Sequence, residues 1–300
     1  MKILKILGAG VAAIICFFIV VGAYLFITTK PMPDHAISDH DGILVLAHRG
    51  GRGLWPENTL FAFRKSVDLG ADALDFDIHS LQDGSFVVIH DDTVNRTTNG
   101  TGNVSDFTLN DIQSLDAGYH WTDDNGSSYP YRGQGVQIPT LVEVFEEFPD
   151  TRMNIEIKTG QPDAVEKFCR LIHDYNKQDQ TVVASFDRKV IQDFRNRCPD
   201  IATAAAAAEA WPFFVFDLLR LGKIYHPDAE TMQVPAYRNA DLLLTRRFVQ
   251  TIHDHNMEIY VWTINDIEQM KTLIEMGVDG INTDYPDRLL NLLGRLSSEK

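Results

Sequence analysis

The sequence predicts an α/β protein, a (β/α)8 barrel preceded by one N-terminal transmembrane helix. Three observations support the barrel. Strand-like and helix-like segments alternate from residue 43 to residue 294, which is typical of a parallel sheet. The roughly 250 residues that they occupy match the usual length of a closed barrel. No glycine-rich nucleotide-binding loop opens the first helix of the series, which argues against an open dinucleotide-binding sheet.

The N-terminal segment predicts a membrane anchor. Residues 6–29 form a run of 24 residues without a charge. As a helix this run would reach about 36 Å, which is enough for a bilayer core of about 30 Å. A cleaved signal peptide is the alternative, but residues 24–27 offer no small-residue cleavage site. Lys2 and Lys5 precede the run, so the positive-inside rule predicts a single-pass protein with a cytoplasmic N-terminus and a periplasmic or extracellular body.

The sequence predicts three successive parts. We expect an anchor over 1–30, a short proline-containing linker over 31–42, and one barrel domain over 43–294. In the first half of the barrel the apolar runs and turn residues predict strands over 43–47, 73–78, 86–89 and 153–157, and helices over 58–69 and 141–148.

Turn residues set the limits of these elements. Gly70 ends the first helix, and Gln82-Asp83-Gly84 is typical of a hairpin turn between the second and third strands. Residues 91–136 are polar and rich in glycine, asparagine, threonine and tyrosine. We therefore expect them to form an insertion after the second strand unit rather than part of the barrel core.

The second half of the domain alternates regularly between helical and extended patterns. The helices are expected over 162–176, 188–197, 209–221, 245–255, 266–275 and 286–296, and the strands over 181–185, 201–205, 241–244, 258–263 and 279–282. The helix over 209–221 is unusually apolar and contains four aromatic residues. It is either a buried helix of the barrel or an exposed apolar lip that meets membrane or acyl chains.

The composition limits the kinds of partner and metal site that this chain can have. With 27 Lys+Arg and 42 Asp+Glu, the formal net charge is −15, which repels phosphate backbones, so we expect no nucleic-acid partner. The three cysteines, Cys16, Cys169 and Cys198, are too few for a disulfide-dense scaffold or a cysteine-rich zinc site. Cys169 shares an apolar helical face with Phe168, so a buried free thiol is favoured over pairing with Cys198, although an extracytoplasmic site permits a disulfide.

Carboxylates gather where the predicted strands end. Asp75 and Asp77 share one face of their strand because alternate side chains point the same way, and Glu156 lies on another strand end. The active site of a (β/α)8 barrel lies at the carboxyl ends of its strands. Three carboxylates that converge there repel one another unless a cation lies between them. Oxygen ligands favour Mg²⁺, Ca²⁺ or Mn²⁺ over zinc.

Two histidines and two cations complete the predicted site. His48 and His90 each close a strand beside the acidic cluster, which suits a general acid–base pair near neutral pH. Arg49 is suited to bind phosphate through two nitrogens, and Lys158 supplies a point charge. Metal, cations and paired histidines together favour phosphodiester cleavage.

Five stretches of the sequence resemble the glycerophosphodiester phosphodiesterase family: AHRGGRGLWPENTLFAF (47–63), GADALDFDIHSLQDGSFVVIHD (70–91), NIEIK (154–158), VWTIN (261–265) and GVDGINTDYPD (277–287). Their order and spacing extend over roughly residues 43–294. The resemblance implies a TIM barrel with an inserted segment after the second strand unit. It also implies hydrolysis of glycerophosphodiesters to sn-glycerol 3-phosphate and an alcohol, with one divalent cation, Ca²⁺ or Mg²⁺.

The resemblance also implies roles for single residues. His48 and His90 would be the acid–base pair, and Arg49 and Lys158 would contact phosphate. The metal ligands would be Asp75, Asp77 and Glu156. Glu57 and Asn58 would support the first loop, and Trp262 would wall the substrate pocket.

Asp75 departs from the family pattern, in which this position is usually Glu. Asp is one methylene shorter, which withdraws the carboxylate by roughly 1–1.5 Å, about one C–C bond. The metal would then shift, gain a water, or be replaced by a more flexible ion such as Ca²⁺.

Three functions follow from these residues. The leading one is a membrane-anchored glycerophosphodiester phosphodiesterase, and the second is a lysophospholipase D that uses the same site on a lysophospholipid at the membrane. The third is a catalytically inactive, membrane-tethered binding module, against which the retention of His48, His90 and Lys158 argues. The first nucleophile, water or the glycerol 2-hydroxyl, stays open.

Overall fold

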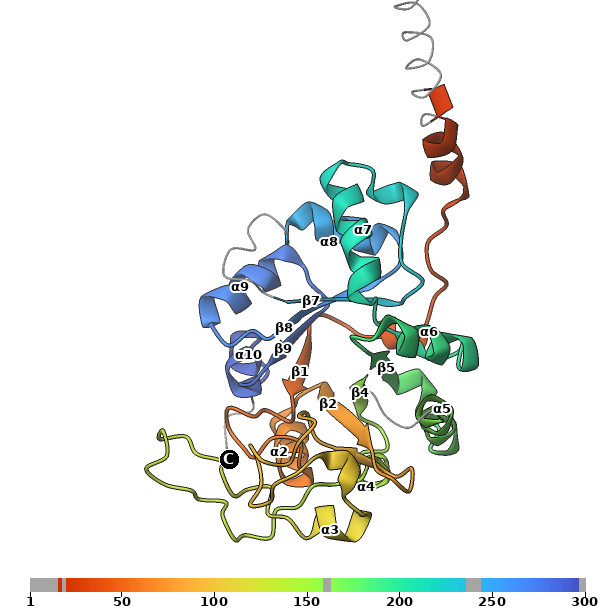
Figure 1. Ribbon diagram of the computed structural model, residues 1–300. Helices are drawn as coiled ribbons and strands as arrows, with labels where there is room; N and C mark the ends of the chain where they lie inside the picture. Colours follow the sequence, from red (N-terminus) through yellow and green to blue (C-terminus); the bar gives the residue numbers. More distant parts are fainter. Residues whose placement is uncertain (1–15, 18–19, 159–162, 236–243, 297–300) are drawn as a thin grey trace, which may run out of the picture.

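The computed structural model describes residues 16–17, 20–158, 163–235 and 244–296. Eight parallel strands form a nearly closed barrel with helices outside it (Figure 1). The strands are β1 (Leu44–His48), β2 (Ala73–Ser80), β4 (Arg152–Ile157), β5 (Thr181–Ala184), β6 (Ala202–Thr203), β7 (Thr231–Pro235), β8 (Glu258–Trp262) and β9 (Gly280–Thr283). Their order in the sheet is β6-β5-β4-β2-β1-β9-β8-β7, and a parallel bridge between Ala204 and Thr231 joins the two edge strands. The predicted (β/α)8 architecture is confirmed.

The outer helices follow the strands in sequence. They are α2 (Leu60–Leu69), α4 (Leu141–Glu147), α5 (Ala164–Asp174), α6 (Arg188–Arg197), α7 (Ala207–Leu218), α8 (Arg246–Asp254), α9 (Ile267–Met276) and α10 (Pro286–Leu292). Several begin at a predictable cap. The Thr59 hydroxyl accepts a hydrogen bond from the Ala62 amide, and Gly70 ends α2 in the left-handed conformation. The inner faces of the helices bury apolar side chains against the sheet, in two large clusters on either side of β1.

The seventh strand differs from the prediction. The sequence predicts it over 241–244, but β7 consists of Thr231–Pro235, pairs with β8, and occupies that place in the barrel. Residues 241–243 lie outside the described residues. The five residues of β7 include Gln233 and a terminal Pro235, so they lack the continuous apolar run that buried parallel strands usually show.

The insertion predicted over 91–136 follows the hairpin of β2 and β3 (Phe86–Val88). It contains the short elements η2 (Val104–Asp106) and α3 (Leu109–Gln113). Its apolar residues, including Val94 and Ile112, form a small core of their own with Val87 and Ile89. The insertion is therefore a compact layer on the barrel rim, drawn in yellow to green in Figure 1.

The residues before the barrel close its amino-terminal end. Within the predicted linker, η1 (Ala36–Ser38) buries Ile37, and the Arg152 guanidinium donates a 2.7 Å hydrogen bond to the Ile37 carbonyl. Most of the predicted anchor lies outside the described residues. Residues 20–28 are helical and stand away from the barrel (Figure 1). Among the helices that the structure describes, none is both long and apolar enough to span a membrane.

Cys169 and Cys198 form a disulfide between α5 and α6, with 6.1 Å between their Cα atoms. The expected free thiol at Cys169 is therefore wrong. The apolar face of α5 was identified correctly, since Phe168 and Ile172 are buried. Cys169, however, lies at the edge of that face, where the neighbouring helix brings the fully buried Cys198 within reach.

Candidate active site

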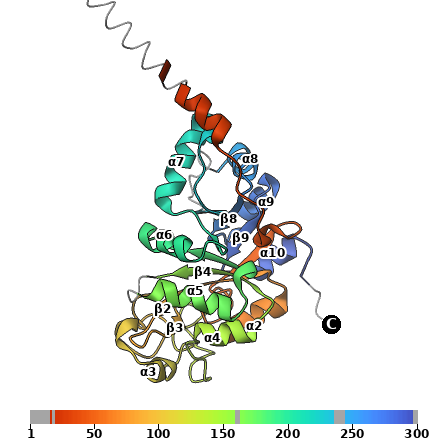
Figure 2. The same ribbon diagram turned by 90° about the vertical axis from the view of Figure 1, so that its right-hand side faces the viewer.

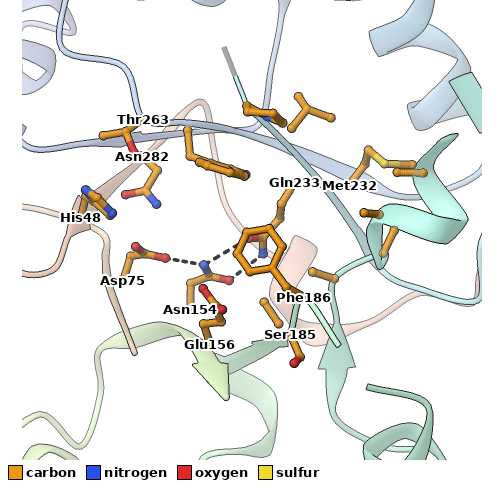
Figure 3. Close-up of a pocket in the computed structure, with 18 of the residues that line it drawn as sticks. His48, Asp75, Asn154, Glu156, Ser185, Phe186, Met232, Gln233, Thr263 and Asn282 are labelled. Atoms are coloured by element: carbon orange, nitrogen blue, oxygen red, sulfur yellow. Dashed lines mark hydrogen bonds between the residues drawn. The ribbon is translucent and has the colours of Figure 1, made fainter. Parts of the chain in front are cut away.

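The carboxyl ends of the barrel strands surround a cavity of about 440 Å³ (Figure 3). Seven residues predicted from the sequence line it: His48, Arg49, Asp75, Asp77, His90, Glu156 and Trp262. The remaining three, Glu57, Asn58 and Lys158, lie directly behind this lining and contact it. The fold thus brings all ten predicted residues into one site.

A tight turn after β1 places Arg49. The backbone is left-handed at Arg49, Gly50 and Gly51, with φ values of 50°, 77° and 79°. A side chain at Gly50 would put its Cβ 2.6 Å from the Phe63 ring, so glycine is required there. The turn directs Arg49 inward, where its guanidinium donates to Glu57 at 2.8 Å and its Nε lies 3.8 Å from Asp77.

The carboxylates come together through the register of β2 and β4. Asp77 pairs with Glu156 in the sheet, and Asp75 pairs with Asn154. The Lys158 ammonium lies between two of the acids, 3.0 Å from Asp77 and 2.7 Å from Glu156. The Asn154 amide donates to Asp75 (Figure 3). A single lysine therefore partly neutralises the acids.

The acids that Lys158 only partly neutralises have raised pKa values at two positions. Burial raises the pKa of Asp75 above its ordinary range. Burial, together with the charges of Asp77 and Asp75, raises the pKa of Glu156 to about 7, although Lys158 opposes that shift. Two of the predicted ligands thus resist ionisation until positive charge is added.

Each histidine has a carboxylate partner at its Nδ1 atom. His48 lies 2.6 Å from Asp284, and His90 lies 2.7 Å from Asp91. Asp284 also accepts hydrogen bonds from Arg52 and Asn265. Burial alone would raise the pKa of Asp284, but the hydrogen bond and charge of His48, together with Arg52 and Asn265, outweigh it and lower the value to about 2. Both imidazoles are oriented so that Nε2 remains for a substrate.

Arg96, which lies in the insertion, joins Glu57 to Asp91. Its guanidinium donates to both oxygens of Glu57, at 2.7 and 2.8 Å, and to both oxygens of Asp91, at 2.7 and 3.0 Å. Glu57 in turn holds Arg49, and Asp91 holds His90. A continuous chain of charged hydrogen bonds therefore connects a predicted catalytic histidine with a predicted phosphate ligand.

The opposite side of the cavity is apolar. It is formed by α7, β7 and α8 together with Phe186 and Trp262, whose rings meet edge to face with centroids 6.1 Å apart. The apolar lining includes Ala207, Ala210, Trp211, Phe214, Val234, Pro235, Leu244 and Phe248. On β7, Gln233 exchanges hydrogen bonds with Asn154 at the border between the two sides (Figure 3).

Comparison with known proteins shows the family of this chain. The model of the glycerophosphoryl diester phosphodiesterase family matches residues 48–288. The chain belongs to this family. It is 36% identical to a glycerophosphodiester phosphodiesterase of Caldanaerobacter subterraneus over 83% of this chain and 97% of the relative. A phosphodiesterase of Oleispira antarctica, solved with the product sn-glycerol-3-phosphate, is similar over 87% of this chain and all of its own, with 25% identity and a TM-score of 0.67.

A human lysophospholipase D is more distant, at 26% identity over 84% of this chain and 87% of the relative. Membership of the phosphodiesterase family makes the chain a phosphoric diester hydrolase, as the sequence predicts.

Four residues of this phosphodiesterase site were not assigned roles from the sequence: Asp91, Arg96, Gln233 and Asp284. Asp91 directly follows His90, and Asp284 closes a strand end, so position alone could have marked both. Arg96 lies in the polar insertion, where nothing in the local sequence indicates that it reaches Glu57. Gln233 was missed together with its strand.

The residues that could hold a metal ion lie at the polar side of the cavity. In the part of the chain that the structure describes, no group of three or more His, Cys, Asp or Glu side chains is arranged to hold a metal ion. Nevertheless, the donor set fits a hard cation. The buried Oδ1 atoms of Asn58 and Asn282 have no hydrogen-bond partner among the described residues, and both side chains adjoin the acids, at Asp77 and Asp75 respectively. Unsatisfied oxygens beside carboxylates of the cavity are what a divalent cation would satisfy.

Proposed function

We propose that the chain hydrolyses glycerophosphodiesters to sn-glycerol 3-phosphate and an alcohol, with a divalent cation and with His48 and His90 as the acid–base pair. The proposal rests on the pair of histidines at the strand ends, each held by a carboxylate, which line the same cavity as the acidic cluster. Family membership supplies the reaction class.

The cation would be held by Asp75, Asp77 and Glu156. When bound, it would supply positive charge to the phosphate and to the developing oxyanion. Asp75 and Glu156 are both half-buried and line the same cavity, so both could face one ion from β2 and β4. Arg49 pairs with Glu57 and Asp77 and also lines the cavity, so its guanidinium would contact a phosphate oxygen of the substrate.

The reaction begins with proton removal by one histidine. We favour the glycerol 2-hydroxyl as the nucleophile, because it is already held next to phosphorus. One imidazole takes the hydroxyl proton, the oxygen bonds to phosphorus, and the bond from phosphorus to the alcohol oxygen breaks. The second imidazole donates a proton to that alcohol. Water then opens the cyclic phosphate with the two roles reversed, which regenerates both histidines.

A 2-deoxy analogue of the substrate tests this route. Without the 2-hydroxyl, cyclisation cannot occur, so the analogue should not be cleaved. Normal cleavage would eliminate the cyclic route and leave water as the first nucleophile. The activity itself is measured as release of glycerol 3-phosphate from glycerophosphocholine and glycerophosphoethanolamine, with Mg²⁺, Ca²⁺ and EDTA in parallel.

A second candidate activity is lysophospholipase D. The apolar side of the cavity favours it, since that side offers little to a small polar alcohol but could pack an acyl chain. A relative with 26% identity bears that name. Hydrolysis of lysophosphatidylcholine at a higher kcat/KM than glycerophosphocholine would establish it, and the reverse ratio would exclude it as the main activity.

We also propose that the body lies outside the cytoplasm, anchored by residues 6–29. Lys2 and Lys5 before that run support this orientation, and the Cys169–Cys198 disulfide suits an oxidising compartment. A reporter fused after Lys300 distinguishes the two orientations. A reporter that works in the periplasm or outside the cell should be active, whereas activity of a cytoplasmic reporter would contradict the proposal.

A further inference from the structure

The outer face of α7 carries an apolar stripe. Trp211, Val215, Leu218 and Leu219 lie at helical spacing i, i+4, i+7 and i+8, so they share one side of the helix. Their exposed fractions are 60%, 48%, 59% and 61%, and Leu221 just beyond the helix is 45% exposed. The other side of α7 already contributes the buried Phe213 to the core. The core therefore does not account for the stripe.

The exposed charged residues of the α7 segment itself are cations. The two acids of α7, Glu209 and Asp217, are both buried and paired, with Arg195 at 2.8 Å and with Arg247 at 3.1 Å. The exposed charged residues of the segment 207–224 are Arg220 and Lys223. Arg220 and Lys223 place cations beside the stripe in a chain of net charge −15, and Lys223 lies 3.5 Å from Asp254 of α8. An apolar stripe flanked by cations suits an anionic, apolar partner.

The stripe also lies beside the end of the apolar N-terminal segment. The Thr29 hydroxyl donates a 3.2 Å hydrogen bond to the Ile224 carbonyl, six residues after the end of α7. The helical residues 20–28 and α7 lie at the same end of the molecule (Figures 1 and 2). Tyr24 and Ile27 on that helix are 65% and 78% exposed. The two apolar surfaces thus lie at the same end of the molecule.

We propose that the α7 stripe, defined as Trp211, Val215, Leu218, Leu219 and Leu221, rests on the surface of an anionic lipid bilayer. The 24 uncharged residues 6–29 provide the reason for choosing a lipid surface over a protein partner, because they end at this face. Trp211 also lines the catalytic cavity next to Phe214, with ring centroids 6.0 Å apart. The stripe therefore brings the apolar side of the cavity to the lipid surface, where an amphiphilic diester could enter.

The contact is tested with the full chain reconstituted in vesicles of phosphatidylcholine and phosphatidylglycerol that carry brominated acyl chains. Bromine quenches tryptophan fluorescence on close contact. The chain has four tryptophans, and Trp211 is the one on the stripe. We expect part of the fluorescence to be quenched in the wild type, and the Trp211→Phe variant to lose that quenchable part. Equal fractional quenching in the two proteins, or none in either, would overturn the proposal.

A kinetic test uses residues outside the cavity lining. The double variant Leu218→Glu/Leu219→Glu should lower the hydrolysis of a vesicle-borne lysophospholipid about tenfold or more and leave hydrolysis of soluble glycerophosphocholine unchanged. Ile267→Glu on α9 is the matched control, since Ile267 is an exposed apolar residue elsewhere, at 42%. Equal loss in the double variant and the control would contradict a role for the stripe.

Two further outcomes are distinguishable. The kinetic test rests on the proposed function, so absence of any hydrolysis would refute that function while the quenching result still decides the lipid contact. If sedimentation instead shows a dimer that the double variant dissociates, the stripe is an interface between two copies of the chain and the lipid proposal is wrong.

Discussion

Replacement of Arg96 by Met should damage both stability and catalysis, because this guanidinium joins Glu57 to Asp91. Burial alone would raise the pKa of Glu57, but the hydrogen bonds of Arg96 and the charge of Arg49 lower it from 4.5 to about 2. At 1.36 kcal/mol per pKa unit, this difference corresponds to about 3.4 kcal/mol. Arg96 makes two of the three hydrogen bonds to Glu57. Since its side chain is 46% exposed and partly screened, we expect a loss of about 1–2 kcal/mol.

The loss should depend on pH in a defined direction. The folded-state pKa of Glu57 is depressed, so its stabilising contribution is fully present above the unfolded value of 4.5 and disappears as the pH falls toward 2. The wild type should therefore exceed Arg96→Met in free energy of unfolding at pH 7, and the gap should narrow at pH 3.5 and below. Denaturant unfolding monitored by tryptophan fluorescence measures both values.

Catalysis should fall because His90 is oriented through Asp91, and Asp91 is held by Arg96. We expect kcat to drop roughly 10-fold to 100-fold, less than the roughly 100-fold or more that loss of a general acid or base costs, because His90 itself is retained, with a smaller change in KM. Arg96→Lys should recover little, because an ammonium cannot bridge two carboxylates with four hydrogen bonds. Arg132→Met is the matched control, since Arg132 lies in the same insertion and contacts Tyr119 and Tyr129 rather than the site. An Arg96→Met enzyme with the stability and kcat of Arg132→Met would refute the reasoning.

Three further outcomes are expected. Glu156→Ala should abolish cation binding and activity with the fold retained. In the wild type, the affinity for the cation, measured by calorimetry, should fall as the pH drops below about 7, where Glu156 becomes protonated. Full turnover of the wild type after EDTA treatment would contradict the proposed metal site. His48→Ala and His90→Ala should each lower kcat roughly 100-fold or more and remove one limb of a bell-shaped pH–rate profile, so a variant that retains both limbs would exclude that histidine. Cys198→Ser should lower the free energy of unfolding by about 3.5 kcal/mol for a closed loop of 29 residues, whereas equal denaturation midpoints with and without reductant would show that the Cys169–Cys198 bond does not stabilise the fold.

The sequence predicts the barrel because most of its strands can be recognised from their local residue pattern. Apolar runs such as Val45–Ala47, and the alternation of helix and strand, follow directly from burial on both faces of a parallel sheet. The position of β7 was not predicted because its residues lack a continuous apolar run. Thr231 and Met232 are buried, but Gln233 and Pro235 belong to the wall of the cavity, where polarity is set by function rather than by packing.

The ten candidate site residues were predictable for a different reason. Parallel strands present their carboxyl ends at one edge, so polar residues such as His48 and Glu156 at strand ends must converge once the fold is a barrel. Contacts made by the insertion do not follow from this rule. Arg96 meets Glu57 across 39 positions of sequence, and the path of the intervening chain depends on the small core around Ile112. The disulfide was not predicted for the same reason, because the approach of α6 to α5 depends on tertiary structure.

Lys158 shows how the structure sharpens a role that the sequence states only loosely. The sequence suggests a phosphate ligand, and the structure places its ammonium within 3.0 Å of both Asp77 and Glu156. Burial alone would lower the pKa of Lys158, but these two carboxylates outweigh that effect and raise it. The same ammonium cannot bind phosphate at full strength while two acids hold it. A divalent cation at the acids would weaken that hold and free the lysine for phosphate, so metal and diester should bind cooperatively rather than independently.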